Sequence, residues 1–158
     1  MVAVIYLAAG AGEVQLESAD PHLQPYLDYN YLGEETDRSR LREATRLCLK
    51  AATDEAFSSI IEERVDPIDD DLASDETLDR WLLTNTRTSH HPSGTCKMGP
   101  SNDPTSVVDQ QGIVHGLEGL RVADASIMPN CIRANTNVTT IVIGERIADF
   151  IRNEVQTA

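Results

Sequence analysis

The sequence is poor in aromatic residues, in basic residues and in long apolar runs. Aromatic residues make up only 4% of the 158 residues, which argues against a stacking platform for single-stranded nucleic acid. Only 13 Lys and Arg stand against 26 Asp and Glu, and the net charge of −13 would repel a phosphate backbone or an anionic membrane. The apolar N-terminal run, residues 2–9, is too short to span a bilayer and lacks the preceding basic residues of a signal peptide. We therefore expect no nucleic acid partner and no membrane span, and we predict a cytoplasmic location.

Metal-binding patterns are also scarce. The three cysteines are widely spaced and form no CxxC pair, so we interpret them as reduced thiols. Two histidines lie close to Cys96, but no second pair of ligands is available to complete a tetrahedral zinc site. The acidic run 66–71 lacks the ligand order of a calcium-binding EF-hand loop, and we interpret it as a solvated loop. The sequence predicts no metal site.

Two glycines near the N-terminus look like the start of a dinucleotide-binding fingerprint. Gly10 and Gly12 follow the apolar run, but the position of the third glycine is taken by Gln15. Residues 13–18 then alternate between apolar and polar side chains, as in a strand, instead of opening a helix. The fingerprint is therefore rejected, and we predict that residues 2–9 form a buried strand paired with residues 13–18.

Capping residues and apolar spacing predict the helices. In chain order, these are a helix that begins near Thr36 or Asp37, a helical stretch over residues 54–64, a helix that begins at Ser74 or Asp75, and a well-packed helix that follows Thr139 or Thr140 and carries apolar residues 141, 143, 144, 147, 148 and 151. Short extended pieces separated by glycine lie between the last two helices. We find no repeat and no linker. The prediction is a single α+β domain over residues 1–158, with a mixed or antiparallel sheet flanked by helices.

Two polar segments stand out for the chemistry that they could perform. Residues 91–99 (HPSGTCKMG) place an imidazole, a natural base near neutral pH, just before a turn of small residues. Residues 135–140 (NTNVTT) place the amide of Asn137 directly before an apolar helix, where asparagine is a common cap. Taken singly, each residue is more often structural than catalytic. Their combination indicates part of an active site, with one proton acceptor and one hydrogen-bonding partner.

Further segments around these two closely resemble one family. With residues 107–109 (VVD), 114–129 (VHGLEGLRVADASIMP) and 144–149 (GERIAD), they resemble the C-terminal portion of the glucose–methanol–choline (GMC) oxidoreductases. Residues 13–32 match the stretch that opens this portion, so the resemblance covers nearly the whole chain. Members of this family are flavoenzymes that oxidise alcohols. The resemblance implies a C-terminal substrate domain together with the returning segment that completes the flavin site.

The resemblance also implies roles for individual residues. His91 matches the active-site histidine that takes the hydroxyl proton of the alcohol while hydride passes to flavin N5, and the proline that follows it selects His91 over His90. Asn137 matches a position that is His in some members and Asn in others. Because an amide does not titrate in this range, Asn137 would hydrogen-bond the alcohol or alkoxide oxygen. The implied cofactor-binding residues are Asp124 and Ala125, along the ribityl and pyrophosphate part of FAD, and Val138 and Thr139, at the pyrimidine end of the flavin ring.

Residues 137–139 are formally a glycosylation sequon, which we expect to be unmodified inside a cofactor-facing motif without a secretion signal. The N-terminal Rossmann segment that holds the ADP half of FAD in the family has no counterpart here, so we expect it to be absent and FAD to bind poorly to this chain alone. The implied activity is that of an FAD-dependent alcohol dehydrogenase or oxidase, inactive without an FAD-binding N-terminal portion or chain. The alternative is a truncated, non-catalytic relic that acts at most as a partner-binding α+β domain.

Overall fold

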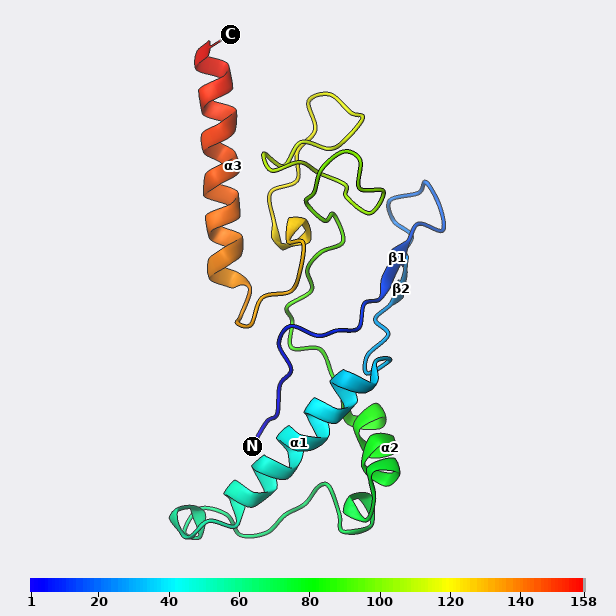
Figure 1. The fold of residues 1–158 in the computed structure, drawn as a ribbon, viewed down its shortest axis with the longest axis vertical. Helices are drawn as coiled ribbons and strands as arrows, with labels where there is room; N and C mark the ends of the chain where they lie inside the picture. The colour runs from blue at the N-terminus through cyan, green and yellow to red at the C-terminus, as the bar shows by residue number, and fades with distance from the viewer. Residues whose placement is uncertain (158) are drawn as a thin grey trace. The chain divides into compact units, whose positions relative to one another are not determined.

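The computed structural model describes residues 1–157, and the side chains through residue 154. The chain divides into two compact units, Met1–Ser89 and His90–Ala158. A two-stranded antiparallel sheet and three α-helices confirm the predicted α+β class (Figure 1). No helix in the described part is both long and apolar enough to cross a membrane. The single domain over residues 1–158 and the cytoplasmic location stay predictions.

The first unit begins with a segment that was expected to be a strand and is not. Residues 1–12 form no strand, and Val2 is 84% exposed. The N–H groups of Ala9 and Gly10 donate to the buried carboxylate of Asp37, at 3.0 and 2.8 Å, and the guanidinium of Arg40 donates to nearby backbone carbonyls. Side chains of a helix, and not a neighbouring strand, therefore satisfy the backbone of this segment. The prediction of a buried strand at 2–9 is wrong.

The two strands pair with each other instead. β1 (Glu13–Gln15) runs antiparallel to β2 (Tyr26–Asp28), with Val14 opposite Leu27. All six residues of this ribbon are exposed. The alternating pattern of residues 13–18 was therefore a correct sign of a strand, but its partner lies downstream.

Both helices of the first unit were predicted, but only the second begins where capping predicted, directly after Ser74. The first has Glu34 at its N-cap, without a side-chain capping bond, and not Thr36 or Asp37. α1 (Glu35–Ala52) and α2 (Asp75–Asn85) lie side by side (Figure 1). The hydroxyl of Ser74 accepts the N–H of Thr77, and the hydroxyl of Thr77 accepts the N–H of Ser74, so a reciprocal capping box starts α2. The expected helix at 54–64 is wrong in extent. Only a 3₁₀ turn, η1 (Glu55–Phe57), forms there, and a second one, η2 (Asp70–Leu72), precedes α2.

A leucine core and a charged cluster join α1 to α2. The core consists of Leu32, Leu41, Leu78 and Leu82. Beside it, the guanidinium of the buried Arg42 in α1 donates to both carboxylate oxygens of Asp79 in α2, each at 2.8 Å. Arg42 also bonds Glu35, and with Arg38 it lowers the pKa of that carboxyl. Arg42 therefore enters the helix interface with its charge paired.

The second unit is built from short extended segments packed against one long helix. Isolated bridges join Met98 to Val108, Val108 to Val114, and Ile113 to Arg121. The 3₁₀ turn η3 (Ala125–Ile127) and the helix α3 (Asn137–Thr157) complete the unit, and Figure 1 shows α3 alongside the irregular segments. The core consists of Val108, Ile127 and Ile147, with partly buried hydrophobic residues around them.

α3 buries a narrower face than its sequence suggested. Ile143, Ile147 and Phe150, at helical spacing, contact the core of the unit. Ile141 and Ile151 are 58% and 45% exposed and Ala148 is exposed as well, so the expected packing of these three residues is wrong. α3 thus covers its own unit with one stripe and leaves other apolar residues uncovered.

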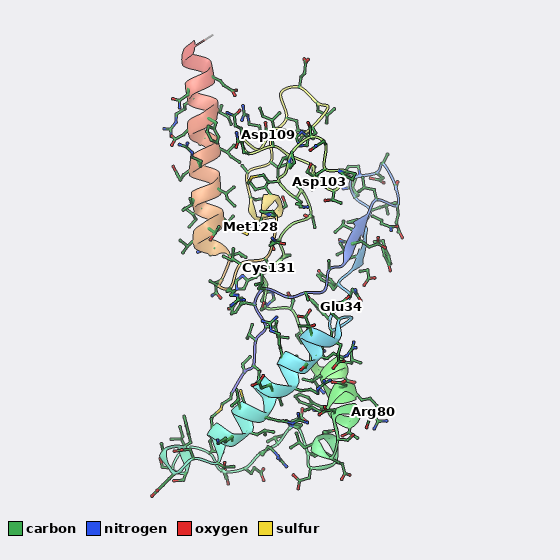
Figure 2. The ribbon with its side chains drawn as sticks, viewed as in Figure 1. Glu34, Arg80, Asp103, Asp109, Met128 and Cys131 are labelled. Atoms are coloured by element: carbon green, nitrogen blue, oxygen red, sulfur yellow. The ribbon has the colours of Figure 1, made fainter. Side chains whose placement is uncertain are left out.

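Asp103 organises a loop of the second unit (Figure 2). Its carboxylate accepts the N–H and the hydroxyl of Thr105, at 2.9 and 2.7 Å, and the ammonium of Lys97 at 3.1 Å. The Thr105 N–H above all, then its hydroxyl and Lys97, lower the pKa of Asp103 to about 2. The ionised carboxylate therefore stabilises the folded state.

Asp103→Asn should consequently destabilise the protein in a pH-dependent way. The folded-state pKa lies below the unfolded value of about 3.9, so the contribution is present above that value and is lost as the pH falls towards about 2. We expect the variant to unfold at lower urea concentration than wild type near neutral pH, and the gap to shrink between about pH 4 and pH 2. Urea unfolding followed by circular dichroism at each pH measures this gap. A gap that stays constant would contradict the assignment.

Candidate functional site

The segment after His91 lies along η3. The N–H groups of Gly94, Cys96 and Met98 donate to the carbonyls of Ala125, Ser126 and Ile127, at 3.3, 2.9 and 2.9 Å. Every second residue of the segment thus bonds one of three consecutive carbonyls of the 3₁₀ turn. These bonds bring the histidine motif next to the stretch that the family resemblance assigns to the cofactor.

The turn after His91 depends on a glycine. Gly94 has φ of +83°, a conformation that side chains with a Cβ rarely adopt, and a Cβ there would approach the carbonyl oxygen of Met128 to 3.3 Å. His90, on the other side of His91, is also left-handed, with φ of +63°. The chain therefore bends sharply on both sides of the half-buried His91.

A buried threonine connects His91 to the start of α3. The Nδ1 atom of His91 lies 3.2 Å from Oγ1 of Thr136, a residue that is 7% exposed. The carbonyl of Thr136 accepts both the N–H and the hydroxyl of Thr140, each at 2.9 Å, so Thr136 is fixed in the first turn of the helix. Asn137 follows it directly. The structure thus brings the two predicted catalytic residues to one place through Thr136, which sequence reasoning passed over between two asparagines.

The first turn of α3 offers hydrogen-bond donors. The first helical bond starts at the N–H of Thr140, so the N–H groups of Asn137, Val138 and Thr139 have no acceptor within the helix. They also lie at the positive end of the helix dipole. This donor set fits an electron-rich carbonyl group, such as the pyrimidine end of a flavin. The residues that the resemblance assigned to that end are therefore chemically suited to it.

Asp124 has a structural task of its own. Its carboxylate accepts the N–H of Ser126 at 2.8 Å and caps η3. Arg121 donates to the carbonyl of Gln111 at 2.8 Å and bonds Glu154 in α3. Asp124 and Ala125 thus belong to the turn that supports the histidine segment, and their contact with a cofactor stays a prediction.

The cysteines do not form a centre of their own. Cys48, Cys96 and Cys131 are free thiols. Within residues 1–157 no three His, Cys, Asp or Glu side chains are grouped so that they could hold a metal ion.

Comparison with known proteins identifies the family. A family model described as GMC oxidoreductase matches residues 8–144. The chain belongs to the GMC oxidoreductase family. The matched model is that of the C-terminal domain, which contains both the His91 and the Asn137 segments.

The relatives are oxidoreductases that are much longer than this chain. An oxygen-dependent choline dehydrogenase of Cronobacter sakazakii is 45% identical over 141 residues, which are 89% of this chain and 25% of the relative. The structure of formate oxidase from Aspergillus oryzae, whose FAD modification has been studied, matches with a TM-score of 0.85 at 33% identity, over 95% of this chain and 26% of that one. Pyridoxine 4-oxidase from Mesorbium loti matches with a TM-score of 0.78 at 28% identity, over 90% of this chain and 27% of that one. This chain thus spans about a quarter of the length of the proteins that it matches.

Proposed function

We propose that this chain is the catalytic and substrate portion of an FAD-dependent oxidoreductase that acts on CH–OH donors. The observation that carries the proposal is the contact of His91 with Thr136 at the first turn of α3, next to Asn137. It joins a proton acceptor to a helix end rich in hydrogen-bond donors. Membership of the GMC family and its choline dehydrogenase relatives support the same activity.

In this proposal one residue of the chain transfers a proton, and the others position the substrate and the cofactor. When bound, FAD would supply the acceptor for the hydride of the alcohol carbon. His91 would take the hydroxyl proton, and Asn137 would donate a hydrogen bond to the oxygen as negative charge develops on it. Backbone N–H groups at the start of α3 would hold the pyrimidine end of the ring. His91 is the only titratable member of the catalytic pair.

An FAD-binding N-terminal portion, on this or another chain, is the proposed partner. Val138, Ile141 and Val142, which share one face of α3, are 71%, 58% and 60% exposed. Such an apolar patch is typical of a surface that another part of the protein covers. The matched relatives are about four times as long as the matched region, which supports a further portion that works together with it.

Choline is the first substrate to test. Relatives that are 45% identical carry the name choline dehydrogenase. The net charge of −13 would also favour the approach of a cationic alcohol over that of an anionic one. We therefore place a cationic alcohol ahead of neutral alcohols in the substrate panel.

The test requires what we call the complete assembly, which is this chain joined to a GMC FAD-binding N-terminal portion and loaded with FAD. The assembly is mixed with choline or with neutral primary alcohols without oxygen, and the visible absorbance of oxidised flavin is followed. We expect this absorbance to disappear with at least one of the alcohols. Bound flavin that stays oxidised with the whole panel would refute the proposal.

Asn137→Ala should slow flavin reduction in the complete assembly by about 10²-fold, because one donor to the developing oxyanion is lost. Asn137→His should be less damaging, since the family accepts histidine at the matching position. Asn130→Ala, which removes an exposed amide elsewhere in the same unit, is the control. Rapid-mixing absorbance measures the three rates. Equal rates for the alanine variants at 137 and 130 would exclude a catalytic role for Asn137.

A further inference from the structure

We propose that Thr136 is a positioning residue, which holds the imidazole of His91 by its Nδ1 atom and selects the tautomer in which Nε2 accepts the proton of the substrate. The catalytic meaning of this inference rests on the proposed function. The tautomer itself can be measured without cofactor or substrate.

The threonine hydroxyl is well placed to fix a ring. Oγ1 of Thr136 is 3.2 Å from Nδ1 of His91, and Thr136 is 7% exposed, so water competes little for the contact. The backbone of Thr136 is held by two bonds from Thr140 to its carbonyl. Its β-branched side chain has few rotamers. The position of the hydroxyl is therefore set by the start of α3.

The contact has a consequence for the proton on the ring. A neutral imidazole carries its proton on one nitrogen and accepts on the other. A hydroxyl can either donate or accept, and the proposal is that here Nδ1–H donates to Oγ1 of Thr136, which leaves Nε2 with the lone pair that a base needs. Free histidine side chains in water favour the opposite tautomer. After proton transfer Nδ1–H can still donate to Oγ1, so the same bond serves the neutral ring and the imidazolium.

Three substitutions distinguish the effect of losing the Thr136 hydroxyl from the effect of disturbing the start of α3. Thr136→Val removes the hydroxyl but keeps the branched shape and the backbone carbonyl. Thr136→Ser restores a hydroxyl. Thr140→Val is the matched control. It also removes a hydroxyl from the start of α3, but that hydroxyl bonds the carbonyl of Thr136 and does not bond His91.

The tautomer is read by long-range ¹H–¹⁵N NMR of the 158-residue chain labelled at its four histidines, above the pH at which imidazole is protonated. The signals lost in His91→Gln identify His91. We expect the Nδ1–H tautomer of His91 in wild type, in Thr136→Ser and in Thr140→Val, and a shift to the Nε2–H tautomer in Thr136→Val. A wild-type His91 that is mainly Nε2–H would overturn the proposal without any variant of Thr136. So would a folded Thr136→Val whose tautomer is that of wild type.

A second readout uses the complete assembly. Thr136→Val should lower the limiting rate of flavin reduction about tenfold or more, leave the alcohol concentration at half-saturation nearly unchanged, and be rescued by serine. If His91→Ala leaves flavin reduction intact, the proposed function fails, whatever the tautomer. If His91→Ala abolishes flavin reduction but the tautomer of His91 is the same in Thr136→Val as in wild type, only the positioning role fails.

Discussion

His91→Ala in the complete assembly is expected to slow the reduction of bound flavin by alcohol by about 10²- to 10⁴-fold, the usual contribution of a positioned base. The variant loses the imidazole that would take the hydroxyl proton. FAD should remain bound, because the imidazole is not part of the proposed cofactor contacts at the start of α3. Anaerobic rapid mixing with choline, followed by flavin absorbance, gives the rate.

His90→Ala is the matched control for this prediction. His90 has the same side chain, adjoins His91 and lies in the second unit, but it precedes the histidine–proline pair of the family motif. We expect it to reduce flavin at nearly the wild-type rate. A His90→Ala variant as slow as His91→Ala would place the effect in the bend of the chain and not in one imidazole.

Leu78→Ala is expected to cost about 2–5 kcal/mol of the free energy of unfolding, the range for emptying a buried leucine site. Leu78 is 0% exposed and lies in the core with Leu41 of α1 and Leu82 of α2. Alanine would leave a cavity between the two helices. Urea unfolding followed by circular dichroism measures the loss.

Leu83→Ala, in the same helix, is the control because Leu83 is 57% exposed. It should change the free energy of unfolding by no more than about 0.5 kcal/mol. Similar losses for both variants would mean that the described core does not hold α1 and α2 together.

Local signals in the sequence were enough to predict that α1, α2 and α3 exist, although α1 and α3 begin earlier than predicted, at Glu35 and Asn137, and the helix expected at 54–64 is only a 3₁₀ turn. Ser74 begins α2 because its hydroxyl caps the backbone three residues later, and that information lies within one turn. The strand at 2–9 was wrong because its apolar run says nothing about the carboxylate of Asp37, which satisfies the backbone from 28 residues away. The terminal helix was found, but apolar periodicity alone could not tell which residues face its own unit and which, such as Ile141, stay exposed.

The site could also be predicted only in part, because the sequence shows local motifs but not the contacts between residues far apart in the chain. The His91 and Asn137 segments were recognised by their resemblance to a family, and membership of that family is confirmed. The roles of the individual residues stay predictions. Thr136 was missed because its contact with His91 joins residues 45 positions apart, and no spacing rule links a hydroxyl to an imidazole over that distance.

The central claim is that this chain supplies the groups that let bound FAD oxidise an alcohol. The most direct measurement compares the FAD-binding N-terminal portion with and without this chain, each mixed anaerobically with choline and the panel of neutral alcohols. We predict that flavin absorbance disappears only when this chain is present. Flavin that is bound by the complete assembly and yet stays oxidised with every alcohol would contradict the account.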